Sequence, residues 1–284
     1  MKAADINIDN KYKHILFRID HYRSLISSIN FETIFEPFQL LVLDNENVEV
    51  KITSLDDIIS WQKELSYSFV TKIHNIENQI LHLTNIEDIY SASILLRHHM
   101  EQCGYITLAN EFFLEFLKDG SLEIIEKFIE KTSFGSPLSN NKNFKYTSDA
   151  FASTRTPKII KFIEALDRFI EEYYEPHKKY LFSKNYSMLN HFAHPSSLSS
   201  TFFSDVKKLK NGHEIKFRYK QNALGDLVKY NLLKLLEQNI LAGYSSYFIF
   251  NSFELKNNEI IKNEEMLKYC WINIIDYFNK GEDV

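Results

Sequence analysis

The sequence predicts an all-α protein, a helical bundle of six or seven main helices with two small β-hairpins. Only seven of the 284 residues are glycine and five are proline, so few tight turns interrupt the chain. Apolar residues recur at steps of three and four over long stretches, which is the spacing of one helix face. Alternation of apolar and polar residues, the pattern of strands, is limited to the short segments 38–52 and 202–220.

The first amphipathic helix is expected over residues 14–29, where isoleucines share one face. Segment 38–52 follows and alternates on both sides of Asp44–Asn47, which can turn, so it predicts the first hairpin. These elements form a candidate N-terminal extension, residues 1–53, in front of a helical domain over 54–284. One continuous domain is the alternative, because no clean linker divides the chain.

Two long helices are expected next. Ser54 is the predicted N-cap of the first, which reaches about residue 83 and carries acidic residues in its first turn. Asn85 is the predicted N-cap of the second, which continues to residue 118 and ends at Gly120. A shorter helix is then expected over 121–131.

The helical spacing of apolar residues disappears over 132–156. This polar stretch is expected to be a loop, long enough to be functional or disordered. Pro157 starts another helix, which Pro176 should break and whose second half stops at Pro195. The second hairpin follows and turns at Asn211–Gly212. Two helices are expected to close the chain, over 223–250 and 258–279.

Composition excludes several classes of protein. The net charge is −5 and the pI about 6.1, so the chain as a whole is not a polyanion binder. Two distant cysteines do not make a disulfide framework, which favours a reducing compartment. No signal peptide and no apolar run of membrane-spanning length is expected, so the predicted location is the cytoplasm.

The predicted helix from residue 85 carries a pair of opposite charges in the segment SILLRHHMEQCGY. Arg97 and Glu101 are four residues apart and share a face with apolar neighbours. Inside a protein these charges would need each other and further hydrogen bonds. A surface ion pair is the alternative, although arginine before glutamate is the weaker order for such a pair.

The segment YSMLNHFAHPSS, residues 186–197, contains the second candidate site. Asn190 and His194 are four residues apart on the predicted helix. The alternative is an ordinary helix end, where the dipole favours a protonated histidine. Another possibility is a metal ion that His99 and Cys103 share with His191 or His194. However, the chain has neither Glu-x-x-His elements nor His-Glu-x-x-His, so no metal is expected.

The second hairpin is locally basic and is a candidate nucleic-acid-binding surface. Its basic residues are Lys207, Lys208, Lys210, Lys216, Arg218 and Lys220. Such a hairpin can lie along a phosphate backbone. A solvated charged face is the alternative.

Taken together, the two helical segments resemble a known pattern. SILLRHHMEQCGY resembles an Arg-x-x-x-Glu signature, and YSMLNHFAHPSS resembles Tyr-x-x-Leu-Ser-x-x-x-His-Pro-Ser, with Asn190 where serine is usual. Both signatures occur in uncharacterised bacterial proteins related to the HEPN (higher eukaryotes and prokaryotes nucleotide-binding) superfamily. The resemblance covers about residues 55–250. It implies a four-helix bundle, often a homodimer, whose relatives include metal-independent ribonucleases of defence systems and non-catalytic proteins.

The superfamily's nucleases usually carry an arginine, then four to six residues, then a histidine, on one helix. No arginine of this chain has a histidine at that spacing. Catalysis would therefore need a composite site, with His194 as general base for a ribose 2′-hydroxyl and Arg97 stabilising the phosphoryl charge. Glu101 would orient the arginine, with Tyr186 nearby and Asn190 on the same helix as Tyr186.

The leading interpretation is an HEPN-like cytosolic protein that acts on or binds RNA or a nucleotide and needs no cofactor. The rival is a non-catalytic interaction module, in which Arg97, Glu101, Asn190 and His194 form a buried network that fixes helix packing. A solvent-open cleft at these residues would favour the enzyme, and a sealed, fully hydrogen-bonded network would favour the module.

Overall fold

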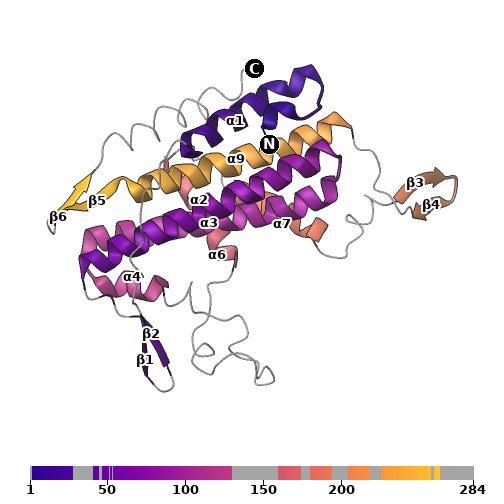
Figure 1. Cartoon of the computed structure of the whole chain (residues 1–284). Coiled ribbons are helices and arrows are strands. Elements are labelled where there is room, and N and C mark those ends of the chain that lie inside the picture. Colours follow the sequence, from indigo (N-terminus) through magenta and orange to yellow (C-terminus); the bar gives the residue numbers. More distant parts are fainter. Residues whose placement is uncertain are drawn as a thin grey trace.

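The computed structural model describes residues 2–27, 41–44, 47–50, 52, 54–129, 159–173, 180–193, 204–217, 225–256 and 259–262. Within these residues the chain forms seven α-helices, and the predicted all-α class is confirmed (Figure 1). The helices are α1 (Lys13–Ser27), α2 (Leu55–Asn85), α3 (Ile89–Asp119), α4 (Leu122–Ile129), α6 (Ile159–Tyr173), α7 (Leu181–Ala193) and α9 (Asp226–Asn251). Two 3-10 turns, Ala3–Asp5 and Asn10–Tyr12, precede α1.

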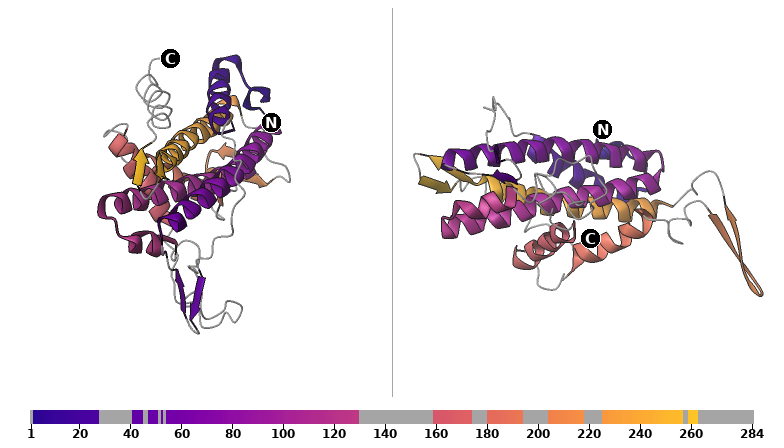
Figure 2. Two further views of the ribbon diagram at one scale, coloured as in Figure 1. Left: turned by 60° about the vertical axis from the view of Figure 1, so that its left-hand side comes forward. Right: turned by 90° about the horizontal axis from the view of Figure 1, so that it is seen from below.

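Three long helices, α2, α3 and α9, form the centre of the bundle. Helix α3 is the common element, because α2, α4, α6, α7 and α9 all pack against it. In the right-hand view of Figure 2, α2 lies on one side of α3, and the shorter α6 and α7 lie on the other. A side chain of α3 can therefore meet either α2 or the pair α6 and α7, depending on its face.

Local capping sets two helix boundaries where the sequence predicts them. The Ser54 hydroxyl accepts from the Asp57 backbone N–H at 3.3 Å, and the Asp57 carboxylate accepts from the Ser54 N–H at 3.0 Å. This reciprocal pair is a capping box, and it starts α2. Gly120 ends α3 with φ of +74°, a left-handed conformation that glycine adopts without a side-chain clash.

The start of α3 differs from the prediction. The N-cap is Asp88, whose carboxylate accepts from the Ser91 backbone N–H at 3.1 Å. The predicted cap, Asn85, is instead the last residue of α2, and its side-chain oxygen accepts from the Asn7 backbone N–H at 3.3 Å. Both residues are good caps, and the connection between α2 and α3 decides which one is used.

Helix α1 packs along α9 and shares its core. Ile15, Ile19 and Ile26 are buried in the same cluster as the long helices. Arg18 of α1 donates from Nε to Oε1 of Glu237 on α9 at 2.6 Å, and the Glu237 side chain is fully buried. The first helix of the predicted N-terminal extension is thus fastened to the bundle by both apolar and ionic contacts.

Helix α6 comes unusually close to α3 at Gly104. A Cβ at this position would lie 2.4 Å from the carbonyl oxygen of Phe162, so glycine is what lets the two helices approach. The predicted loop 132–156 and the predicted helix break at Pro176 lie outside the described residues.

Short strands pair antiparallel at three places in the described chain. The pairs are β1 (Leu41–Asp44) with β2 (Asn47–Val50), β3 (Ser204–Leu209) with β4 (Gly212–Phe217), and β5 (Phe253–Lys256) with β6 (Glu259–Lys262). The first two pairs lie in the segments 38–52 and 202–220.

The third pair replaces the start of the helix predicted over 258–279. Ile260 and Ile261 of β6 lie opposite Leu255 and Glu254 of β5. Both isoleucines are β-branched and favour strands, and cross-strand pairing here outweighs their helical spacing. Residues 263–279 of that predicted helix lie outside the described chain.

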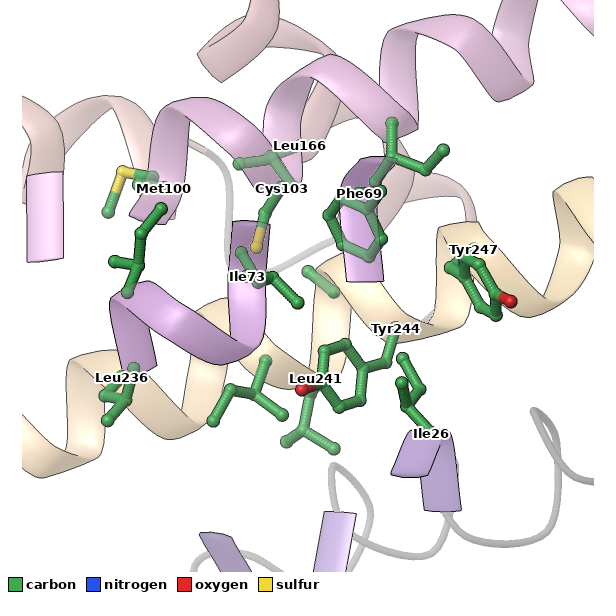
Figure 3. Close-up of a cluster of buried hydrophobic side chains, with 14 of the residues drawn as sticks. Ile26, Phe69, Ile73, Met100, Cys103, Leu166, Leu236, Leu241, Tyr244 and Tyr247 are labelled. Carbon is green, nitrogen blue, oxygen red and sulfur yellow. The ribbon is translucent and has the colours of Figure 1, made fainter. Parts of the chain in front are cut away.

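The core cluster contains buried side chains from every described α-helix, and Figure 3 shows part of it. The side chains labelled there include Ile26 of α1, Ile73 of α2, Cys103 of α3, Leu166 of α6 and Tyr244 of α9. Helices α3 and α9 are closely packed where Cys103 meets Gly243, since a Cβ on that glycine would lie 2.5 Å from the cysteine sulfur. The central part of α3 is therefore held tightly on two sides, which positions the polar residues it carries.

Candidate functional site

The first candidate site lies on α3. Arg97 and Glu101 form an ion pair one helical turn apart, with Nε 3.2 Å from Oε1. About a quarter of the Arg97 side chain (23%) and less of the Glu101 side chain (17%) is exposed. The pair is therefore neither fully exposed nor fully buried, and it lies at the edge of the core.

Tyr186 of α7 completes this cluster. Its hydroxyl donates to Glu101 Oε1 at 2.8 Å and accepts from Arg97 Nε at 3.1 Å and Nη2 at 3.0 Å. The guanidinium carbon is also 5.2 Å from the centroid of the tyrosine ring, within cation–π range. One phenol thus joins both members of the α3 pair, and the three residues are called the Arg97 cluster below.

A contact between α6 and α7 places Tyr186. The Asp167 carboxylate on α6 accepts from the backbone N–H groups of Phe182 at 2.7 Å and Ser183 at 3.0 Å. These are first-turn donors of α7 that have no partner within their own helix. Asp167 is buried and caps α7 from a neighbouring helix, so it fixes where the first turn of α7 begins and where Tyr186 points.

Protonation in the cluster follows from burial and contacts. Burial raises the pKa of Glu101, but hydrogen bonds from His98 and Tyr186 and the charge of Arg97 outweigh it and hold that pKa below its usual range. Burial also raises the pKa of the Tyr186 phenol. At neutral pH the cluster is therefore a guanidinium, a carboxylate and a neutral phenol.

His98 extends the Arg97 cluster toward solvent. Its Nδ1 lies 3.4 Å from Glu101 Oε2, and half of its side chain is exposed. The sequence motifs assign His98 no role. Its position three residues before Glu101 was the available signal for a hydrogen bond along the helix.

Two further predicted site residues are Asn190 and His194, and the structure describes the first of them. Asn190 lies one turn after Tyr186 on α7, and its buried Oδ1 has no hydrogen-bond partner among the described residues. His194 follows the last residue of α7 and lies outside the described residues. The composite pairing of Arg97 with His194 therefore stays a prediction.

The basic hairpin projects away from the helices in Figures 1 and 2. Lys207, Lys208, Lys210 and Lys216 are exposed, whereas Arg218 and Lys220 lie outside the described residues. The strand register pairs Lys207 with Glu214 and Lys216 with Asp205, and Lys216 Nζ is 3.6 Å from Glu214 Oε1. Among the described lysines of this hairpin, Lys208 and Lys210, near the turn, are thus the two with no acidic residue opposite them in the register.

A second polar cluster lies inside the bundle and was not predicted. Glu77 of α2 is fully buried, and its Oε1 accepts from the Tyr244 hydroxyl at 2.8 Å and lies 3.2 Å from His99 Nε2. Its Oε2 accepts from Arg23 Nε at 2.9 Å. A carboxylate only accepts, so His99 Nε2 carries a proton. Four helices, α1, α2, α3 and α9, thus meet at one carboxylate.

Electrostatics keep the Glu77 side chain charged. Burial raises its pKa, but the hydrogen bond and charge of His99, the charge of Arg23 and the Tyr244 hydroxyl outweigh burial and lower that pKa. In the sequence, Glu77 stands four residues after Ile73 and so on the apolar face of α2, and this position was the available signal for a buried carboxylate. The partner on α1 is 54 residues away and left no such signal.

The histidine and cysteine considered as metal ligands have other contacts. Cys103 Sγ lies 3.7 Å from His99 Nδ1, while the opposite ring nitrogen faces Glu77. Burial raises the pKa of the Cys103 thiol well above its usual value. Across the described ranges, no three His, Cys, Asp or Glu side chains are grouped so that they could hold a metal ion.

Comparisons with known proteins identify no relative. No protein-family model matches the chain, no curated protein matches it, and no solved structure matches it. None of the described helices is both long and apolar enough to cross a membrane. The fold and sites define an all-α bundle with one buried carboxylate cluster and one partly exposed Arg–Glu–Tyr cluster, and the HEPN resemblance stays a prediction from two motifs.

Proposed function

We propose that this protein is an HEPN-like cytoplasmic protein that binds RNA or a nucleotide at the Arg97 cluster and cleaves RNA without a metal ion. The observation that supports this most is the cluster itself. Two segments whose motifs suggested a common site, 85 residues apart, contribute an arginine, a carboxylate and a phenol in mutual contact. A role in stress or defence follows from the resemblance alone.

The chemistry of Arg97 suits a phosphate ligand. A guanidinium presents several donors in one plane and binds phosphate oxygens in pairs. In Arg97, Nε and Nη2 are engaged by Tyr186 and Glu101, whereas Nη1 has no hydrogen-bond partner among the described residues. Tyr186 and Glu101 thus fix the plane of the guanidinium and leave one edge for a ligand.

The hairpin would contribute to affinity for a longer RNA. Lys208 and Lys210 are exposed near its turn and can contact phosphates, and Lys207, Lys216, Arg218 and Lys220 complete the proposed surface. Removing a lysine that binds a phosphate should weaken binding of all sequences alike and reduce its salt dependence. Lys208→Ala with Lys210→Ala should therefore weaken RNA binding more than Lys207→Ala with Lys216→Ala.

A specific observation supports the non-catalytic module as a second candidate. Glu101 already neutralises Arg97, and Tyr186, only 6% exposed, bonds to both. A network that merely fixes α7 on α3 would make the same contacts. In that case the cluster would contribute to stability and partner docking without binding RNA.

One experiment separates the two candidates. Wild type, Arg97→Ala and His194→Ala are incubated with total cellular RNA, with and without chelator, and the melting temperature of each is measured. Arg168→Ala is the matched control, because Arg168 forms a two-contact pair with Glu111 and joins α6 to α3 outside the cluster. A decrease in cleavage of about 10²–10³-fold in Arg97→Ala, with the control unchanged, supports the enzyme.

The opposite result is equally clear. If no RNA is bound or cut by wild type, and Arg97→Ala only lowers the melting temperature, the module is correct. The resemblance also implies a homodimer, which sedimentation of the wild-type protein would test.

A further inference from the structure

His74 of α2 lies beside the Glu77 cluster, and one of its ring nitrogens is buried. This nitrogen, Nε2, has no hydrogen-bond partner among the described residues. The described charges that act on the ring are those of Glu77, three residues later on α2, and Arg23 of α1. A protonated imidazole donates from both nitrogens, and a buried donor without an acceptor is costly. In the folded protein this position therefore favours the neutral ring.

Arg23 connects α1 to α2 at the same place. It donates from Nε to Glu77 Oε2 at 2.9 Å and from Nη2 to Asn78 Oδ1 at 2.8 Å. Only 13% of its side chain is exposed, so this contact is largely shielded from water. A proton on His74 would add a second positive charge near this guanidinium, and the new charge would have no acceptor at Nε2.

Two side chains can therefore act as the counter-ion of Glu77, one in each protonation state of His74. While the ring is neutral, Arg23 from α1 is the partner. Residues three apart on a helix are neighbours, so a protonated His74 can pair with Glu77 once Arg23 has moved away. The buried carboxylate then keeps a cation near it without α1, which lowers the cost of separating α1 from α2.

We propose that His74 makes the attachment of α1 to α2 sensitive to pH, because in acid its protonated ring replaces Arg23 beside Glu77. The second half of α1, which carries Arg23, then moves away from α2. The first half stays on α9, because Arg18 pairs with the buried Glu237 and an arginine does not titrate in this range.

Other polar groups face this carboxylate and its arginine. His99 of α3 and Tyr244 of α9 both contact Glu77 Oε1, and neither contact involves α1. Asp20 of α1 lies 3.8 Å from Arg23 Nη1 and moves with the arginine. His74 is therefore distinguished by its position, because it is the described histidine next to the only contact here that links α1 to α2 through Glu77.

The direction of the pH effect follows from the surroundings of the ring. Burial lowers the pKa of His74 and outweighs the opposing charge of Glu77, and Arg23 lowers that pKa further. In the open state the ring regains a pKa of about 6.5 or more. The attachment is therefore strongest above that pH. It weakens by up to about tenfold for each pH unit below it, until the pH reaches the pKa of the buried ring.

Hydrogen exchange of the full-length protein, followed by mass spectrometry at about pH 7.5 and about pH 5.5, tests this proposal. Glu77 stays ionised at both, since its pKa is below the usual value. After correction for intrinsic exchange rates, we expect the protection of residues 20–27 to fall about three- to tenfold in acid. The protection of α3 should change less than about twofold.

Matched variants decide whether His74 is the cause. His74→Gln cannot titrate, so its protection of residues 20–27 should change less than about twofold between the two pH values. His74→Leu gives the same comparison if glutamine lowers the stability of the whole protein. His82→Ala removes an exposed histidine of the same helix and should behave as wild type. No fall in wild type, an equal fall in both His74 variants, or an equal fall in α3 would overturn the proposal.

Discussion

Replacing Glu77 with glutamine tests whether the buried cluster holds the bundle together. The change keeps the shape of the side chain but removes the charge that faces Arg23, whose side chain is only 13% exposed. Removing one partner of a buried ion pair costs about 3–5 kcal/mol when the other charge is left uncompensated. Arg23 Nη1 also lies 3.8 Å from Asp20 Oδ1, which offsets part of this cost. Glutamine retains an oxygen that can accept from Tyr244, so we expect a decrease in stability near the lower limit, about 3 kcal/mol.

The pH dependence of this decrease provides a second test. Because the pKa of Glu77 is lower in the folded protein, its carboxylate stabilises the fold above the usual glutamate pKa. That contribution disappears as the pH falls through the folded pKa, below about 4.3. Glutamine cannot ionise, so the difference between wild type and Glu77→Gln should be largest at neutral pH and should shrink in acid.

Urea unfolding followed by circular dichroism, from neutral pH down to below the usual glutamate pKa, measures both effects. Glu123→Gln is the control, because Glu123 pairs with Lys127 on the surface of α4 and its replacement should not change stability measurably. Equal stability of wild type and Glu77→Gln at neutral pH would refute the reasoning. A large difference that did not change with pH would show that folding does not shift the pKa of Glu77.

Three other predictions concern the packing around the two clusters. Asp167→Ala should lower stability by about 1–2 kcal/mol in urea unfolding and reduce RNA cleavage, because α7 loses its cap; unchanged stability would contradict this. Gly104→Ala should cost about 1–3 kcal/mol, since the added methyl meets backbone atoms of α6, whereas Gly225→Ser, with open space, should be neutral or slightly stabilising. In a Cys270→Ser variant, the buried thiol of Cys103 should resist thiol reagents until the protein is unfolded, and fast labelling of the folded protein would count against its burial.

The sequence determined the features that depend on neighbours along the chain. Helical spacing predicted the all-α class, and the caps at Ser54 and Gly120 were visible because each acts within a few residues. The contact of Arg97 with Glu101 was predicted in the same way, since residues four apart meet on any helix. The motif added Tyr186 as a neighbour of this pair, but it specified no contact between them.

Only the tertiary structure decided the remaining features. Asp88 rather than Asn85 starts α3, and the Asn85 side chain instead bonds to the distant Asn7. A strand replaces the helix predicted at 259–262, because these residues pair with the neighbouring strand β5. The Glu77 cluster is the clearest case, because nothing in the sequence around Glu77 distinguishes it from an ordinary glutamate on a helix. Its partners come from three other helices, and only the packing of those helices brings Arg23 and Tyr244 within hydrogen-bonding distance of one carboxylate.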